Sequence, residues 1–497
     1  MKFTLTEIFI VLLTSFLFFI ITFAQSERSK HKEEYTYFKN NLTQDILIKE
    51  DTTEIIPLQY KKSDLTRAVF GYLPFWEYFN SRNLIRYDLL THIALFDFTV
   101  DSMGNVFNPY YWPWTDVINK AHLNGVKVIL TAVNFESLQI KNILRNQTAK
   151  TNFFNQVKDK MLQYQFDGIN VDFEDLKTED RGSVLNNFMS ELTEFIKFYK
   201  TDAEVSFAGP AINWGGWDLR GLVESCDYIF IMGYSFYGSW SSTTGASAPL
   251  SGGTYNINNV VNIQYSWATA SAPEKLILGV PYYGEKWKTT TDLPHSSVTK
   301  YISSTRFKND IDSVTYFGRL WATDNKVPWY RFQRGGEWHQ VWYDDDSSLG
   351  LKYDLAESKN YRGIGMWALG YDGSKPHLWN EIERRYKPLS INNPSNSLNG
   401  INHFDLLQNY PNPFNPSTKI RFVIDSKWST SEYVLLHIYD ITGREVVKLV
   451  DGYLENGLHQ IDFNIDMVDE KIMTSSVYFY RLSIGGKTLT KKMIYLK

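Results

Sequence analysis

Residues 166–174 read FDGINVDFE, and this stretch decides which fold the sequence predicts. Most of its positions are apolar, over a length typical of a buried strand. Because successive side chains of a strand point to opposite faces, Asn170, Asp172 and Glu174 share one face, and the apolar residues between them share the other. The stretch therefore predicts a buried strand that presents two carboxylates and one amide on the same side.

Similar apolar runs recur along the chain, separated by segments compatible with helices, such as residues 183–200. Near-continuous apolar strands that alternate with helices indicate a parallel sheet covered on both faces, and eight of them over about 300 residues predict an α/β fold, the (β/α)8 TIM barrel. Chemistry in such barrels takes place at the C-terminal strand ends, so Glu174 is expected at the mouth, Asp172 one layer deeper and Asn170 below it. The other seven runs cover residues 68–76, 91–99, 126–134, 204–212, 227–235, 275–283 and 363–371.

Changes in composition along the chain divide it into further parts. Residues 25–66 are polar without a clear period and predict a linker, and the barrel is expected to span residues 67–388. Within it, alternating segments in residues 288–350 predict an inserted β-containing subdomain. Residues 389–402 are rich in Asn, Ser and Pro, as linkers are, and residues 403–497 alternate with period two, as expected of a small antiparallel sandwich.

The N-terminus and the composition restrict the compartment and the partners. Residues 1–24 predict a secretory signal cleaved after Ala24, although the apolar run is also long enough for an uncleaved membrane anchor. The net charge of -4 gives no reason to expect a nucleic-acid partner. The single cysteine, Cys226, excludes an internal disulfide, and without a Cys-rich or His-rich cluster we expect neither a metal nor an organic cofactor. We expect the chain to act as a monomer.

The two carboxylates of the opening stretch require a physical explanation. Burying them costs several kcal/mol unless they are paired or share a proton, and no basic residue lies within the stretch, which favours a catalytic pair over an ion-paired strand end. Acids on adjacent same-face positions lie about 6–7 Å apart along a strand, close enough for one pKa to be raised, as a general acid needs. The pair fits an inverting glycosidase, or an acid beside a residue that positions a substrate acetamido group as the nucleophile.

Four stretches resemble one known family. DGINVDFE (167–174) resembles the DGxDxDxE signature of glycoside hydrolase family 18, the chitinase-like family. MGYSFYGS (232–239), LGVPYYGEKW (278–287) and the segment 341–372 resemble the family's sixth-, seventh- and eighth-strand regions in the same order. The resemblance covers roughly residues 67–388, and the four motifs together are specific although each alone would be weak.

The resemblance implies a role for each matching residue. Glu174 would be the general acid and base, and Asp172 would orient the substrate acetamide and stabilise an oxazolinium-type intermediate. Tyr234 would complete the catalytic set by hydrogen-bonding that acetamide, and Trp367 would stack beneath the sugar. The alternative is that Tyr234 and Trp367 are ordinary core aromatics. Further positions implied to bind substrate are Asn170, Met232, Ser235 and Tyr282.

Three residues depart from the family pattern. Asn170 replaces the middle Asp of the signature, as in the spore-cortex-lytic and chitobiase-like branches, Ser235 stands where the family usually has Asp, and Glu285 replaces the usual Arg. These departures affect the rate and the substrate preference rather than the reaction class. The expected substrate is a glycan containing β-1,4-linked N-acetylglucosamine, such as chitin or chito-oligosaccharides. Peptidoglycan is the alternative substrate, and a lectin-like protein that binds chitin with little turnover is the alternative class.

The C-terminal residues resemble a second family. YPNPFNPST and the final KKMIYLK within residues 403–497 resemble the type A sorting domain of the type IX secretion system. The resemblance implies Sec export followed by passage across the outer membrane, with the type IX secretion machinery as a partner and a secreted or cell-surface product. The alternative is a carbohydrate-binding or adhesive β-module.

Overall fold

The computed structural model describes most of the chain, which divides into two compact units, residues 1–388 and 389–497. The signal sequence expected in residues 1–24 and the linker expected in residues 389–402 lie outside the described residues. Among the helices that the structure describes, none combines the length and the apolar character needed to cross a membrane. The described residues are 29–42, 53–59, 64–387, 403–425, 431–468, 473–484 and 487–497.

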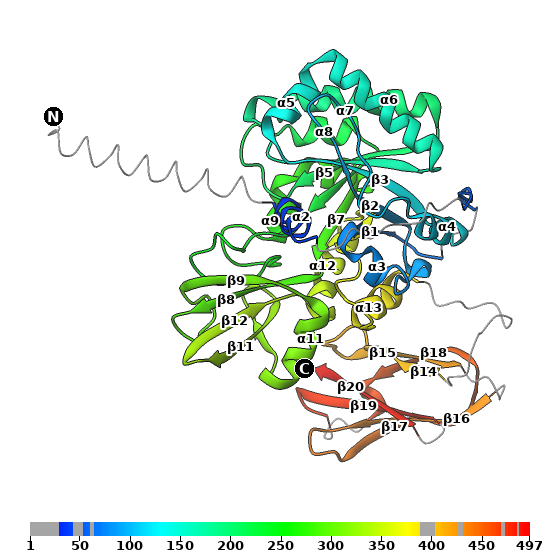
Figure 1. The fold of residues 1–497 in the computed structure, drawn as a ribbon. Helices are drawn as coiled ribbons and strands as arrows, with labels where there is room; N and C mark the ends of the chain where they lie inside the picture. The colour runs from blue at the N-terminus through cyan, green and yellow to red at the C-terminus, as the bar shows by residue number, and fades with distance from the viewer. Residues whose placement is uncertain are drawn as a thin grey trace, which may run out of the picture. The chain divides into compact units, whose positions relative to one another are not determined.

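Eight parallel strands of the first unit close into a barrel, as the alternating apolar runs predict (Figure 1). Pairing of β1 with β13 closes it, in a register that sets Ala68 opposite Gly363. Going around the barrel, the order of the strands is β1-β13-β7-β6-β5-β4-β3-β2. Their bounds are β1 Ala68–Pro74, β2 His92–Thr99, β3 Lys127–Asn134, β4 Gly168–Phe173, β5 Glu204–Pro210, β6 Tyr228–Met232, β7 Leu276–Pro281 and β13 Gly363–Trp367.

Helices cover the outside of the barrel because each has an apolar stripe that must be buried. In α7 (Ser183–Tyr199) the buried residues include Leu185, Phe188, Leu192 and Ile196, which recur at helical spacing. The other helices that follow β1 in this part are α3 Tyr78–Ser81, α4 Thr115–Leu123, α5 Ser137–Arg145, α6 Gln147–Gln163, α8 Leu219–Ser225, α9 Ile257–Asn259, α10 Ser266–Ser271, α12 Asp346–Ser358 and α13 His377–Tyr386.

The predicted insertion between the seventh and eighth barrel strands is an antiparallel sheet with its own small core. The sheet begins at Tyr283, earlier than the predicted residue 288, because β8 follows β7 almost directly, and it ends at Trp342. Trp287, Trp329 and Trp342 form much of its core. The sheet has the order β10-β11-β12-β8-β9, with β8 Tyr283–Thr289, β9 Val298–Arg306, α11 Phe307–Phe317, β10 Leu320–Ala322, β11 Val327–Arg334 and β12 Glu337–Trp342.

The second unit consists of two antiparallel sheets that bury one apolar core, as predicted for a small sandwich. Phe422 from one sheet and Leu436 and Tyr480 from the other belong to this core. The first sheet has the order β14-β15-β18 and the second β17-β16-β19-β20. The strands are β14 His403–Leu406, β15 Ser417–Asp425, β16 Ser431–Tyr439, β17 Glu445–Glu455, β18 Gly457–Asn464, β19 Ser476–Ile484 and β20 Lys487–Tyr495.

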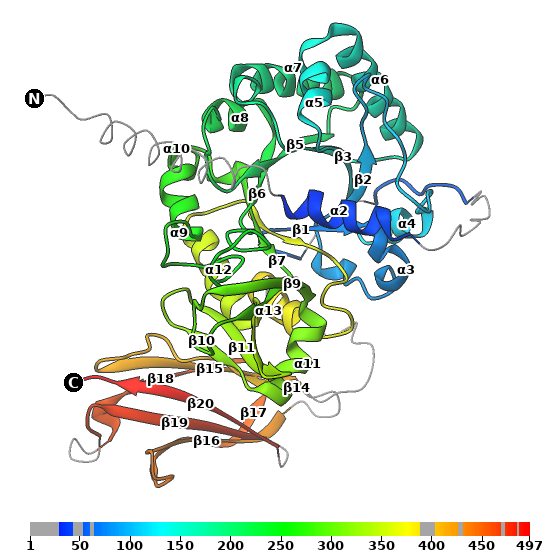
Figure 2. The ribbon, with the colours of Figure 1, turned by 60° about the vertical axis from the view of Figure 1, so that its left-hand side comes forward.

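The expectation of a polar linker over residues 25–66 is wrong for the described residues in that range. Helix α2 (Lys30–Asn40) lies across the mouth of the barrel, at the C-terminal ends of its strands (Figures 1 and 2). Residues 53–59 also pack on the barrel, where the Ile56 amide donates to Asn119 Oδ1 at 2.8 Å. The residues that α2 buries are charged or polar and pair with polar groups of the cleft, and only Tyr35 and Phe38 within the helix add partly buried apolar contacts, so hydrophobic periodicity gave a weak signal for it.

Candidate active site

Strand β4 points its polar side chains into the barrel, as its alternation predicts. Asn170 lies in the interior, where its Oδ1 accepts a hydrogen bond from the Tyr72 hydroxyl at 2.7 Å and its Nδ2 donates to Ser206 Oγ at 2.9 Å. On the other face the Phe173 ring packs against Phe188 of α7, with centroids 6.2 Å apart. Both the oxygen and the nitrogen of the Asn170 amide are therefore hydrogen-bonded in a layer beneath the carboxylates.

The first acid of the stretch, Asp167, has a structural role. Its Oδ2 lies 3.0 Å from His122 Nε2 and accepts from the Val128 amide at 2.8 Å, and its Oδ1 accepts from Lys200 at 3.3 Å. Burial alone would raise the pKa of Asp167, but the hydrogen bond and charge of His122, together with the other donors, lower it. Asp167 ties the start of β4 to its neighbours and is not part of the mouth.

Asp172 and Glu174 form a close pair at the C-terminal end of β4. Asp172 is fully buried, and an oxygen of each carboxyl group lies within 4.8 Å of the other and of a ring nitrogen of His31. Burial and the neighbouring Asp172 charge raise the pKa of Glu174 to about 8, against the opposing effects of His31 and Ser29. Glu174 therefore carries a proton near neutral pH and can deliver it to a leaving oxygen.

Three further predicted residues lie at the same mouth. Tyr234 and Met232 come from the end of β6, and Trp367 is the last residue of β13. Tyr234 and Trp367 are both buried, and His31 of α2 contacts both of them. The structure thus brings together Asp172, Glu174, Tyr234, Trp367 and Met232 from three different strands.

Ser235 lies at the rim, whereas Tyr282 faces away from it. The Ser235 backbone has φ 64°, in the left-handed region, and its hydroxyl lies 3.1 Å from the Tyr283 hydroxyl. Tyr282 points towards Tyr353 of α12 and Asp372, and burial raises its pKa. Tyr283 contacts both Ser235 and, at 4.8 Å from its ring centroid, the Lys30 ammonium of α2. Tyr283, and not the predicted Tyr282, is therefore the tyrosine on the cleft side.

Helix α2 inserts side chains between these residues that no pattern in the sequence predicted. The His31 ring stacks on Trp367 with centroids 3.7 Å apart and an interplanar angle of 27°. Its Nδ1 lies 2.7 Å from Asp172 Oδ2, and its Nε2 lies 2.8 Å from the Tyr234 hydroxyl. Burial would lower the pKa of His31, but the charge and hydrogen bond of Asp172 outweigh it and raise that pKa. The basic partner that the opening stretch lacks comes from a segment more than a hundred residues away, which no local pattern could reveal.

The same cluster is the part of the described chain whose ligand atoms could surround a metal ion. His31, Asp172 and Glu174 offer one nitrogen and two oxygens at suitable separations. However, the 2.7 Å hydrogen bond between His31 and Asp172 already uses two of these atoms. The geometry is that of a charge-assisted hydrogen bond, which needs no ion to explain it.

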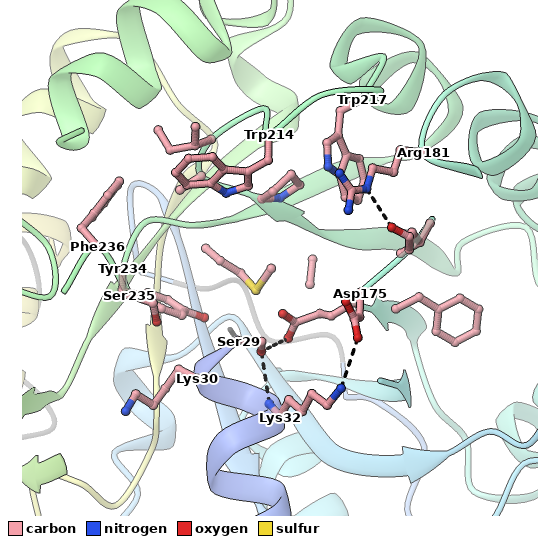
Figure 3. A pocket seen from close by; sticks show the side chains of 18 of the residues that line it. Ser29, Lys30, Lys32, Asp175, Arg181, Trp214, Trp217, Tyr234, Ser235 and Phe236 are labelled. Atoms are coloured by element: carbon pink, nitrogen blue, oxygen red, sulfur yellow. Dashed lines mark hydrogen bonds and ion pairs between the residues drawn. The ribbon is translucent and has the colours of Figure 1, made fainter. Parts of the chain in front are cut away.

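Beside Glu174 a pocket remains that α2 does not fill. Figure 3 shows Ser29 and Lys32 on one side of it, facing Trp214 and Trp217 on the other. Arg181 lies in the same wall, held by hydrogen bonds from its guanidinium to the Leu176 and Gly215 carbonyls. Aromatic faces beside a protonated carboxyl group suit a sugar ring on the leaving-group side of that acid.

Comparison with known proteins assigns the barrel to a family. Residues 68–372 match the family described as glycosyl hydrolases family 18, and the chain belongs to this family. Over 277 residues, 50% of this chain and 71% of the relative, it is 28% identical to the di-N-acetylchitobiase of Mus musculus. Over 307 residues, 58% and 66% of the two chains, it is 24% identical to the cortical fragment-lytic enzyme of Bacillus subtilis. The crystal structure of a Group IV chitinase from Ostrinia furnacalis shares the fold, with a TM-score of 0.57, 21% identity and coverage of 64% and 98%.

The second unit also matches a known family. Residues 408–496 match the secretion system C-terminal sorting domain, which confirms the resemblance seen in the sequence. The chain is therefore a glycoside hydrolase that carries a tail indicating secretion or display at the cell surface.

Proposed function

We propose that this chain hydrolyses β-1,4 bonds of glycans that contain N-acetylglucosamine, by substrate-assisted catalysis with retention of configuration. The observation that carries the proposal is the arrangement of Asp172, Glu174, Tyr234 and Trp367 at one mouth of the barrel. A sugar ring on Trp367 would place its acetamido group between Asp172 and Tyr234. In the structure Asp172 and Tyr234 contact the two ring nitrogens of His31, and this ring stacks on Trp367.

Each residue then has a defined step. Glu174, whose pKa is raised by burial and by the neighbouring Asp172 charge, gives its proton to the glycosidic oxygen while the acetamido carbonyl oxygen attacks the anomeric carbon. Asp172 accepts the acetamido N–H and stabilises the positive charge that develops on the oxazolinium-type ring, and Tyr234 hydrogen-bonds the acetamide. Glu174, now ionised, removes a proton from the water that opens this ring, so the released sugar keeps its configuration.

The separation of the two acids favours this route over inversion. Inverting glycosidases need about 6.5–9.5 Å between their carboxyl groups to hold a water molecule. Here one oxygen of Asp172 and one of Glu174 lie within 4.8 Å, and Asp172 lies deeper in the barrel than Glu174. That position suits a residue that contacts the acetamide better than one that activates water on the far side of the sugar.

Chitin or chito-oligosaccharides are the leading substrate, and peptidoglycan glycan strands are the second. The relative from Mus musculus is named a di-N-acetylchitobiase, and that from Bacillus subtilis a cortical fragment-lytic enzyme. Asn170 places a neutral amide under the acid pair, hydrogen-bonded at its oxygen and its nitrogen. Asp172 therefore has no carboxyl group beneath it with which to share a proton. Both substrates have the acetamido group that the mechanism needs.

Replacement of the acid tests the proposal. Glu174→Gln keeps the size of the side chain but removes its proton donor, and we expect release of sugars from chito-oligosaccharides and from purified peptidoglycan to stop. Glu194→Gln, an exposed change on α7, is the matched control and should leave the rate unchanged. Mass spectrometry of the products on both substrates identifies the preferred glycan. Undiminished hydrolysis by Glu174→Gln would overturn the mechanism.

We also propose that the chain leaves the cell by Sec export followed by outer-membrane passage. The match of residues 408–496 to the sorting domain supports this route. Mass spectrometry of the protein recovered from the culture medium should find a new N-terminus at Gln25 and the loss of the tail. An N-terminus at Met1 with an intact tail would contradict the route.

A further inference from the structure

Helix α2 buries charged side chains to an extent that a surface helix does not. Lys30 is 1% exposed, His31 0% and Glu34 5%. An isolated helix of this length is marginal in water, so its stability here comes from what it contacts. These contacts are the groups of the candidate active site.

Residues at the start of α2 form hydrogen bonds with both acids of the pair. Ser29 is the N-cap residue, and its hydroxyl donates to Glu174 Oε1 at 2.5 Å. The His31 ring hydrogen-bonds Asp172 and Tyr234 and at the same time stacks on the face of Trp367. In the proposed mechanism these are the groups that hold the acetamido group and the sugar ring.

The rest of the helix matches the cleft in charge. The Lys30 ammonium lies 2.6 Å from Glu285 Oε1, and both side chains are fully buried. Glu34 accepts hydrogen bonds from Trp367 Nε1 at 2.7 Å and pairs with Arg306 at 2.7 Å. Glu285, where the family usually has an Arg, is therefore complementary to a cation of this chain's own N-terminal segment.

Substrate and helix cannot occupy this place together. With centroids 3.7 Å apart, the His31 and Trp367 rings are in contact, and Trp367 and Asp172 are 0% exposed. A sugar ring needs the same Trp367 face, and its acetamide needs the same Asp172 oxygen. Binding of substrate therefore requires α2 to leave.

We infer that residues 29–40 act as an intramolecular inhibitor that occupies the sugar-binding subsite of the barrel, an inference that rests on the proposed function. Residues 53–59 hold the chain on the barrel surface, so α2 stays tethered when it leaves the cleft. A tethered segment competes at an effective concentration on the order of millimolar, enough for a weakly binding helix to exclude substrate. The fraction of molecules with an open cleft then scales the apparent affinity for substrate.

Point variants in the full chain test this inference. His31→Ala removes the ring on Trp367 and the contacts with Asp172 and Tyr234, and Glu34→Ala removes those with Trp367 and Arg306. Hydrogen bonds to charged groups are each worth roughly ten- to hundredfold in an equilibrium, so each variant should raise kcat/KM on chito-oligosaccharides by about that factor, through a lower KM. Tyr37→Ala, which shortens a side chain on the exposed side of the same helix, should change nothing.

Two readouts besides turnover separate the possible outcomes. Hydrogen–deuterium exchange should rise for residues 30–40 in His31→Ala and Glu34→Ala, but not in Tyr37→Ala. If exchange of residues 30–40 is faster in these variants but their kcat/KM on a hydrolysed glycan is unchanged or lower, the inference that α2 inhibits the enzyme is wrong. Should no variant hydrolyse any glycan, tighter binding of a chito-oligosaccharide by His31→Ala than by wild type would uphold the inhibitor and refute the proposed hydrolysis. Equal binding by the two would refute the inhibitor.

Discussion

The buried ion pair between Lys30 and Glu285 gives the sharpest physical prediction about the helix. The two groups lie 2.6 Å apart and neither is exposed to solvent. Lys30→Met keeps the length of the side chain but removes its charge, which leaves Glu285 buried beside the helix without its cation. Removing one partner of a buried pair costs about 3–5 kcal/mol, because the remaining charge is uncompensated.

This cost lowers the stability of α2 bound in the cleft, and it does not lower the stability of the barrel itself. When the helix leaves, water reaches Glu285, so the variant responds by opening the cleft. We expect hydrogen–deuterium exchange of residues 30–40 to accelerate by about 10² to 5 × 10³, while the Tm of the barrel changes little. The double variant Lys30→Met with Glu285→Met restores a compensated, apolar contact and should return exchange towards the wild-type rate.

Lys39→Met serves as the control for the loss of one positive charge from the same helix. Lys39 is exposed and contacts the Tyr35 hydroxyl at 2.9 Å, so its removal should cost less than about 1 kcal/mol. A lower Tm for Lys30→Met with no local rise in exchange would refute the reasoning, because α2 would then be an inseparable part of the barrel.

Three further predictions concern individual residues. Burial raises the pKa of Asp97 to about 7, above its unfolded value near 3.9, so its contribution to stability is complete below pH 4 and is lost as the pH rises to 7. Urea unfolding should show Asp97→Asn to be equal to wild type at pH 4 and up to about 4 kcal/mol more stable at pH 8, and equal differences at both pH values would contradict this. In the His31→Ala background, Tyr234→Phe should lower kcat/KM on chito-oligosaccharides about tenfold or more, and an unchanged rate would remove Tyr234 from the mechanism. In that background Asn170→Asp should move the alkaline limb of the pH–rate profile upwards, because added negative charge disfavours ionisation of Glu174, and a downward shift would count against Glu174 as the acid.

The barrel and its acid pair could be predicted because their signals are local. Period-two alternation in residues 166–174 determines which side chains share a face, and the structure places Asn170 and Asp172 in the interior and Phe173 against the helices. The same rule could not decide which of two adjacent tyrosines faces the cleft, because Tyr282 lies between β7 and β8 rather than within a strand. The motif resemblance selected Tyr282, whereas Tyr283 lies beside Ser235.

Helix α2 could not be predicted because its stability comes from long-range polar contacts. The residues that α2 buries are charged or polar, whereas its apolar Tyr35 and Phe38 are only partly buried. Its partners Asp172, Tyr234 and Glu285 lie more than a hundred positions further along the chain. Composition alone therefore indicated a solvated linker. The contacts of α2 explain two unusual features of the sequence. His31 is the partner of an acid pair that has no basic residue nearby in the sequence, and Lys30 pairs with Glu285, which stands in place of an Arg.

The configuration of the first sugar released tests the catalytic mechanism most directly. Proton NMR can follow the anomers formed when the full-length His31→Ala chain cleaves a chito-oligosaccharide, before mutarotation mixes them. Attack by the acetamido group, assisted by Asp172 and Glu174, predicts that the β-anomer appears first. Initial release of the α-anomer would mean inversion by a water molecule and would contradict the assignment of Asp172 and Glu174.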